Sequence, residues 1–148
     1  MGLSANDELW SVLERWLDAD GLDFIEKVSN ISQTWDDLID KDKLIQDEDI
    51  NTAFLDAIKL ASHPFVQRFP AIYTVMCLQI TTWLESNYIE QYQKHILQVS
   101  FVYRSAVTPI IMASIEMLRG TSDRRIAARE IYPLIFDETF EEYVKSVA

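Results

Sequence analysis

The sequence predicts an all-α fold, a single domain built as a bundle of about seven helices with no sheet. Apolar residues recur three and four positions apart along almost the whole chain of 148 residues, which is the spacing of one buried helix face. No segment alternates apolar and polar residues over the length that a strand needs. The three glycines and four prolines mostly lie between the periodic segments. The predicted helices cover residues 9–17, 22–40, 47–62, 70–86, 88–118, 121–131 and 138–147.

The first two helices are each predicted from one apolar stripe. In the first, leucines repeat every four residues from Leu9 to Leu17, and Ser4 or Asn6 can serve as the N-cap. Residues 18–21 have the composition of a turn, so the second helix is predicted to begin directly after them, at residue 22. Its predicted apolar face consists of Phe24, Ile25, Val28, Ile31, Trp35 and Ile39.

The third helix is predicted from its acidic beginning. Three acids at residues 47–49 favour the positive end of a helix dipole, and the pair His63-Pro64 ends the helix. The pattern predicts two packing faces. One is Ile50, Phe54 and Ile58, and the other is Ala53, Ala57 and Ala61.

The remaining helices are bounded by proline and glycine. Pro70 suits the first residue of the fourth helix, and Gly120 suits the end of the fifth. Pro109 lies inside the long fifth pattern, 88–118, where it predicts a kink or a break. Pro133 separates the last two helices.

The negative charge is concentrated in the first third of the chain. The formal net charge is 13 − 24 = −11. Residues 1–56 hold fifteen acids and four bases (4 − 15 = −11), whereas residues 57–148 hold nine of each. We expect one domain over 1–148, with an acidic part and a near-neutral part. Because phosphate backbones and anionic lipids repel such a surface, neither nucleic acid nor a membrane is an expected partner.

Composition excludes several further classes. With three glycines, the chain has neither a dinucleotide fingerprint nor a Walker loop. Cys77 is the sole cysteine, which excludes an internal disulfide and fits a reducing compartment. The longest uncharged run, residues 69–84, is too short and too polar to span a bilayer, and the N-terminus lacks a signal-peptide pattern. We therefore expect a cytoplasmic protein.

One acidic cluster stands out near the end of the second predicted helix. Asp36 and Asp40 are four residues apart and share one helix face, while Asp37 projects about 100° away. Ser29 and Gln33 extend this face into a polar strip that we expect to border a groove. Like charges at this spacing repel, so something is expected to offset the repulsion.

The offset can come from two sources, which the residues leave open. Mg²⁺ binds carboxylate oxygens and often bridges to phosphates, which makes Asp36, Asp37 and Asp40 candidate ligands. Alternatively Lys41, Lys43 or a distant arginine pairs with the aspartates without any chemistry.

Two resemblances bear on function. The string from Asp36 to Asp40 resembles the aspartate-rich motif of the all-α isoprenoid synthases, which implies that these aspartates hold Mg²⁺ against a substrate diphosphate. Residues 28–43, the turn at His63-Pro64-Phe65 and the segment 101–120 are similar in texture to small helical proteins encoded by tailed bacteriophages, which implies an accessory role.

Arginines suggest what else could contact a ligand or a partner. Arg104 interrupts an apolar run, so it must reach water or a partner, either an acid of the cluster or a ligand phosphate. Three arginines on the sixth helix form a basic patch that could bind the acidic third of a second subunit. They are Arg124, Arg125 and Arg129.

These features favour a binding protein over an enzyme. We expect an acidic accessory protein that binds a partner protein, or itself, through residues 1–56, with no certain cofactor. The alternative is Mg²⁺-dependent binding or turnover of a phosphorylated small molecule. In that case Ser29, Gln33 and Arg104 contact the ligand beside the aspartate cluster.

Overall fold

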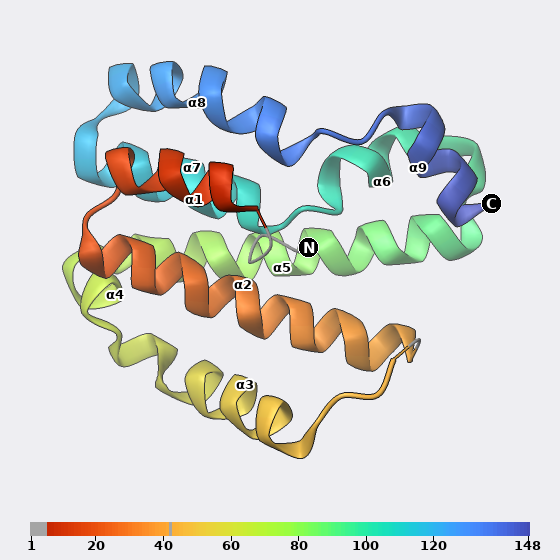
Figure 1. Ribbon diagram of the computed structural model, residues 1–148, viewed down its shortest axis with the longest axis horizontal. Coiled ribbons are helices and arrows are strands. Elements are labelled where there is room, and N and C mark those ends of the chain that lie inside the picture. Colours follow the sequence, from red (N-terminus) through yellow and green to blue (C-terminus); the bar gives the residue numbers. More distant parts are fainter. Residues whose placement is uncertain (1–5, 42) are drawn as a thin grey trace.

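The computed structural model describes residues 6–41 and 43–148 and confirms the all-α class, because no strand occurs among them. Seven helices have eight residues or more, and two short ones, α4 and α6, lie between them (Figure 1). The bounds are α1 Asp7–Trp16, α2 Ala19–Asp40, α3 Asp47–Lys59, α4 Pro64–Arg68, α5 Ala71–Tyr92, α6 Leu97–Tyr103, α7 Val107–Arg119, α8 Thr121–Ile135 and α9 Phe140–Val147.

Side-chain caps set the first two helix starts. The Asn6 side chain accepts the Leu9 N–H at 3.0 Å and so caps α1, whereas the other candidate, Ser4, lies outside the described residues. Asp18 caps α2 by accepting the Gly21 N–H at 2.8 Å. Residues 18–21, expected as a turn, therefore open α2 three residues earlier than predicted. Gly21 is buried there, and a Cβ at this position would lie 3.2 Å from the Phe65 ring.

The core is formed where α7 meets α2, α5 and α8. Ile110, Ile111 and Ile115 of α7 are fully buried. On α2, Phe24 stacks on Phe65 of α4 with ring centroids 5.5 Å apart, so the short helix closes one end of the core. The predicted apolar face of α2 is thus correct in its first half.

The segment predicted as one long fifth helix is divided differently. Helix α5 runs on to Tyr92, past the expected end near Ser86, and the following residues form a 3₁₀ turn, α6 and α7. The main break lies at residues 104–106, and Pro109 stands in the first turn of α7. A proline clashes with the carbonyl four residues before it, here that of Ser105, so a helix cannot run through that position undisturbed.

One further difference concerns the C-terminal third. Helix α8 continues through Pro133 to Ile135, with the proline in its last turn, where we had predicted a separation.

Residues 94–119 have the length and composition of a membrane-spanning helix, with a mean hydropathy of 1.4. Among the described residues this is the one such stretch, and it is not one continuous helix, because residues 104–106 interrupt it. Its second half is α7, whose apolar side chains fill the core.

Helix α3 lies at the edge of the molecule and packs mainly on α2 (Figure 1). Ala53 is buried against it, whereas Phe54 and Ile58 remain 60% and 76% exposed. The described chain thus leaves most of the large apolar face uncovered, with Ile50 half-buried. The predicted small face is also mostly wrong, because Ala53 is buried whereas Ala57 and Ala61 are exposed.

Candidate functional site

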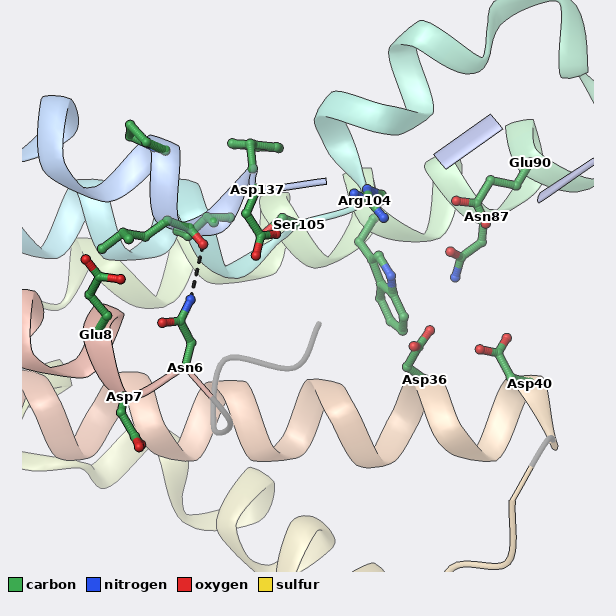
Figure 2. Close-up of a pocket in the computed structure, with 15 residues that line it drawn as sticks. Asn6, Asp7, Glu8, Asp36, Asp40, Asn87, Glu90, Arg104, Ser105 and Asp137 are labelled. Carbon is green, nitrogen blue, oxygen red and sulfur yellow. Dashed lines mark hydrogen bonds between the residues drawn. The ribbon is translucent and has the colours of Figure 1, made fainter. Parts of the chain in front are cut away.

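A cleft of about 860 Å³ opens between α2 and α5. The end of α8 and the beginning of α1 also line it. Asn6, before α1, donates its Nδ2–H to the Leu134 carbonyl of α8 at 3.1 Å and so joins these two helices at the cleft (Figure 2). Trp83, 3% exposed, lines the cleft, and its ring packs edge-on against Trp35 with centroids 5.5 Å apart. The cleft therefore has a fixed aromatic wall.

The side chains around this cleft are strongly acidic. Of the residues that the structure describes, six carboxylates and one guanidinium line it, so the charge of this part of the lining is 1 − 6 = −5. The acids come from four separate places in the sequence. They are Asp7, Glu8, Asp36, Asp40, Glu90 and Asp137. Such a lining attracts cations and disfavours a free phosphate or diphosphate.

The structure brings together three of the residues that the sequence selected. Asp36 and Asp40 project from α2 into the cleft, and Arg104 reaches it from the end of α6 (Figure 2). Asp36 is half-buried, and burial, together with the neighbouring charges of Asp40, Asp37 and Glu90, raises the pKa of its carboxyl group. The repulsion inferred from the spacing is thus present in the folded chain.

The other selected residues lie elsewhere. Asp37 accepts the Gln33 Nε2–H at 2.9 Å and pairs with Lys43 at 3.0 Å, outside the cleft lining. Ser29 is 2% exposed within the helix interface. The predicted strip does not line one groove, because Ser29 is buried, Gln33 donates to Asp37, and Asp36 and Asp40 are the described α2 residues that border the cleft.

A three-aspartate metal centre does not fit this arrangement. Among residues 6–41 and 43–148, no group of three or more His, Cys, Asp or Glu side chains is placed to hold a metal ion. Asp36 and Asp40 could supply two carboxylate oxygens to Mg²⁺, while Asp37 is engaged by Gln33 and Lys43.

Arg104 is held by protein groups and is not free to clamp a phosphate. It donates to Glu138 Oε2 at 2.9 Å, and its guanidinium carbon lies 4.6 Å from the centroid of the Tyr143 ring. Tyr143 in turn donates its hydroxyl to Glu90 Oε1 at 2.8 Å, and burial raises the pKa of that hydroxyl to about 12. The arginine therefore joins α6, α9 and the segment before α9.

The solvent-facing side of α3 is a second candidate site. We call it the α3 face and define it by Asp47, Glu48, Phe54, Leu55 and Ile58. Leu55 is 52% exposed, so three large apolar side chains of this one helix face water. Single exposed apolar residues are common, but a contiguous group on one helix marks an interaction surface.

Sequence reasoning missed much of both sites. The α5 residues of the cleft, Trp83, Asn87 and Glu90, follow a helical spacing that also fits a plain core and surface pattern. The signal for the α3 face was present as two apolar stripes on a short helix, which is more than one neighbour can cover.

Comparison of the chain with protein-family models, with curated proteins and with solved structures gives no match.

Proposed function

We propose that this chain is a protein-interaction module that binds a basic partner protein through its acidic first third, with the α3 face as the main contact. The observation that carries the proposal is the exposure of Phe54, Leu55 and Ile58, between 52% and 76%, on a helix that begins with acids. Burying such side chains against a partner contributes about 1.5–3 kcal/mol each at full burial.

Charge supports the same assignment. All of the formal net charge lies in residues 1–56, which contain α1, α2 and most of α3. The cleft adds Glu90 and Asp137 to this field, so a basic partner is attracted over a surface wider than α3. Electrostatic attraction of this kind raises the rate of association and selects against acidic partners.

The test is the affinity of an identified partner for matched variants. The partner is first recovered by co-purification with the tagged chain, identified and prepared pure, and its dissociation constant is then measured by calorimetry. Phe54→Ser/Ile58→Ser is expected to weaken binding at least about tenfold, since 1.4 kcal/mol equals one factor of ten.

The control replaces two equally exposed apolar residues elsewhere. Leu78 and Tyr88 on α5 are 61% and 54% exposed, so Leu78→Ser/Tyr88→Ser removes similar apolar surface away from α3. It is expected to bind like the parent. Equal affinity of the parent and the α3 variant, or equal weakening by both variants, would contradict the proposal.

A second candidate function rests on Asp36 and Asp40, which share one face of α2 and both border the cleft. It is Mg²⁺-dependent binding of a diphosphate-bearing small molecule, with the two aspartates toward the cation. Titration with Mg²⁺ and pyrophosphate, beside Asp36→Asn/Asp40→Asn, tests it. Saturable binding that requires both aspartates supports this function, and identical heats from parent and variant exclude it.

A further inference from the structure

Helix α8 carries an exposed surface whose chemistry is the reverse of the α3 face. We call it the α8 face and define it by Arg125, Ile126, Arg129 and Tyr132. These residues recur at three- and four-residue spacing and all are exposed, with Ile126 at 47% and Tyr132 at 42%. The opposite side of α8, through Ala127 and Ile131, is buried in the core.

The two arginines of the α8 face have no acidic partner among the described residues. Their neighbour Arg124 differs, because it turns to Glu116 on α7 and pairs with it at 2.6 Å. Arg125 and Arg129 are therefore two exposed positive charges, beside apolar surface, on a chain whose net charge is −11.

We propose that the α3 face of one molecule binds the α8 face of a second copy of the chain. This inference rests on the proposed function and names one occupant for the α3 face. Acids and apolar side chains on α3 meet arginines and apolar side chains on α8, so charge is complementary along the contact. The two helices have 13 and 15 residues, about 20 and 22 Å at 1.5 Å per residue, so they can lie against each other along their length.

The spacing of the two faces supplies a register. From Asp47 to Phe54 is seven residues, and from Arg125 to Tyr132 is also seven. Seven residues are close to two helical turns, so the members of each pair lie on the same side of their helix. With the helices running in the same direction, Asp47 comes beside Arg125 when Phe54 comes beside Tyr132.

The position of the faces decides what kind of assembly results. Helices α3 and α8 lie along opposite edges of the molecule, with the other long helices between them (Figure 1). One molecule cannot bring its own two faces together, and the contact joins two different surfaces. Such a head-to-tail contact leaves one free face at each end, so it produces rings or open chains of molecules and not a closed two-fold dimer.

Sedimentation velocity over a series of protein concentrations tests the inference by charge reversal. One variant is Asp47→Lys/Glu48→Lys, and the other is Arg125→Glu/Arg129→Glu. Each variant alone places like charges on both faces, so its sedimentation coefficient is expected to stay at the monomer value while that of the parent rises with concentration. An equimolar mixture of the two restores opposite charges at both contacts and is expected to regain the rise.

The control is Lys94→Glu/Lys145→Glu, which changes the net charge as much as the arginine variant does, away from both faces. It is expected to associate like the parent. A parent that remains monomeric at every concentration overturns the self-pairing, and so does a mixture that fails to recover. If the identified partner still requires Phe54 and Ile58 in that case, the proposed function stands. If the parent associates but the α3 and α8 variants do so equally, self-pairing through these faces is wrong.

Discussion

At the scale of single residues, Asp36 is the clearest case of a side chain in an unfavourable position. It is half-buried at the cleft, with Asp40 one turn further along α2 and Glu90 across from it. Burial and these like charges disfavour its ionised form, which raises the pKa of its carboxyl group above the ordinary value of 3.8. Proteins keep such groups where a ligand or a partner later supplies the compensating charge.

Replacing Asp36 by asparagine is expected to raise the free energy of unfolding at pH 7 by about 0.5 kcal/mol, the size of one like-charge i,i+4 repulsion. Because the folded pKa is raised, the folded chain holds more protons than the unfolded chain between the two pKa values. The parent therefore loses stability as the pH rises through that window, and the variant does not. The gap between them should be small near pH 3 and largest at neutral pH.

Urea unfolding of both proteins at several pH values measures this gap. Glu14→Gln, which removes an exposed acid from α1, controls for the general loss of negative charge. A less stable Asp36→Asn variant at pH 7 would mean that the carboxylate is compensated in the free protein.

At the scale of secondary-structure elements, α9 depends on the N-cap residue before it and on one buried ring. Thr139 accepts the Glu142 N–H at 3.1 Å, and the Glu142 side chain accepts the Thr139 N–H at 2.9 Å, which completes a capping box. Tyr143, 1% exposed, then inserts between α5 and α6, where its hydroxyl lies 2.7 Å from Ser100 Oγ. An eight-residue helix is not stable alone, so these contacts hold it in place.

Thr139→Ala is expected to lower the free energy of unfolding by about 1 kcal/mol, because the Glu142 N–H loses the hydroxyl that accepts its hydrogen bond. Thr139→Ser keeps a hydroxyl at the same position and is expected to lose much less. Thermal unfolding followed by circular dichroism compares the three proteins. Equal melting temperatures for the alanine variant and the parent would show that Tyr143, and not the cap, holds α9.

At the scale of the whole molecule, the dominant feature is an uneven charge distribution. The acidic third forms α1, α2 and most of α3, whereas α8, which carries the exposed arginines of the α8 face, lies on the opposite edge from α3 (Figure 1). Mutual repulsion among the acids opposes folding, and the ion pairs that offset it, such as Lys27 with Asp23 and Arg68 with Asp18, are between largely exposed side chains and contribute little. The α3 edge of the molecule is therefore acidic, and the opposite edge carries the two arginines of the α8 face beside the acidic helix α1, which packs on α8.

Added salt is expected to stabilise the folded chain. Raising NaCl from about 0.01 M to about 0.1 M shortens the Debye length from about 30 Å to about 10 Å, which screens repulsion between acids of different helices. The melting temperature should rise by a few degrees, and by less in the variant Glu8→Gln/Glu14→Gln/Glu26→Gln, which carries three fewer exposed acids. A melting temperature that falls with NaCl would show that attractive pairs such as Arg68 with Asp18 outweigh the repulsion.

Much of this arrangement is local and can be predicted from the sequence. Apolar periodicity predicts the helical class, and acids or caps predict the starts of α1 and α3, because these effects act within one or two turns. The clustering of Asp36 and Asp40 on one face follows from helix geometry alone. Pro109 also predicts a kink or a break in its helix. The break lies at residues 104–106 because the proline ring would clash with the carbonyl four residues before it.

The sites themselves could not be predicted in this way. Arg104, Glu90 and Asp137 line the same cleft as the aspartates of α2. They meet because the fold brings together segments that are separated by up to a hundred residues in the sequence. Likewise the pattern of α3 shows two apolar faces, and only the packing against α2 makes Ala53 the buried one and leaves Phe54 and Ile58 exposed. A helix presents its faces through short-range geometry, whereas the neighbour that covers a face is selected by packing between segments distant in sequence.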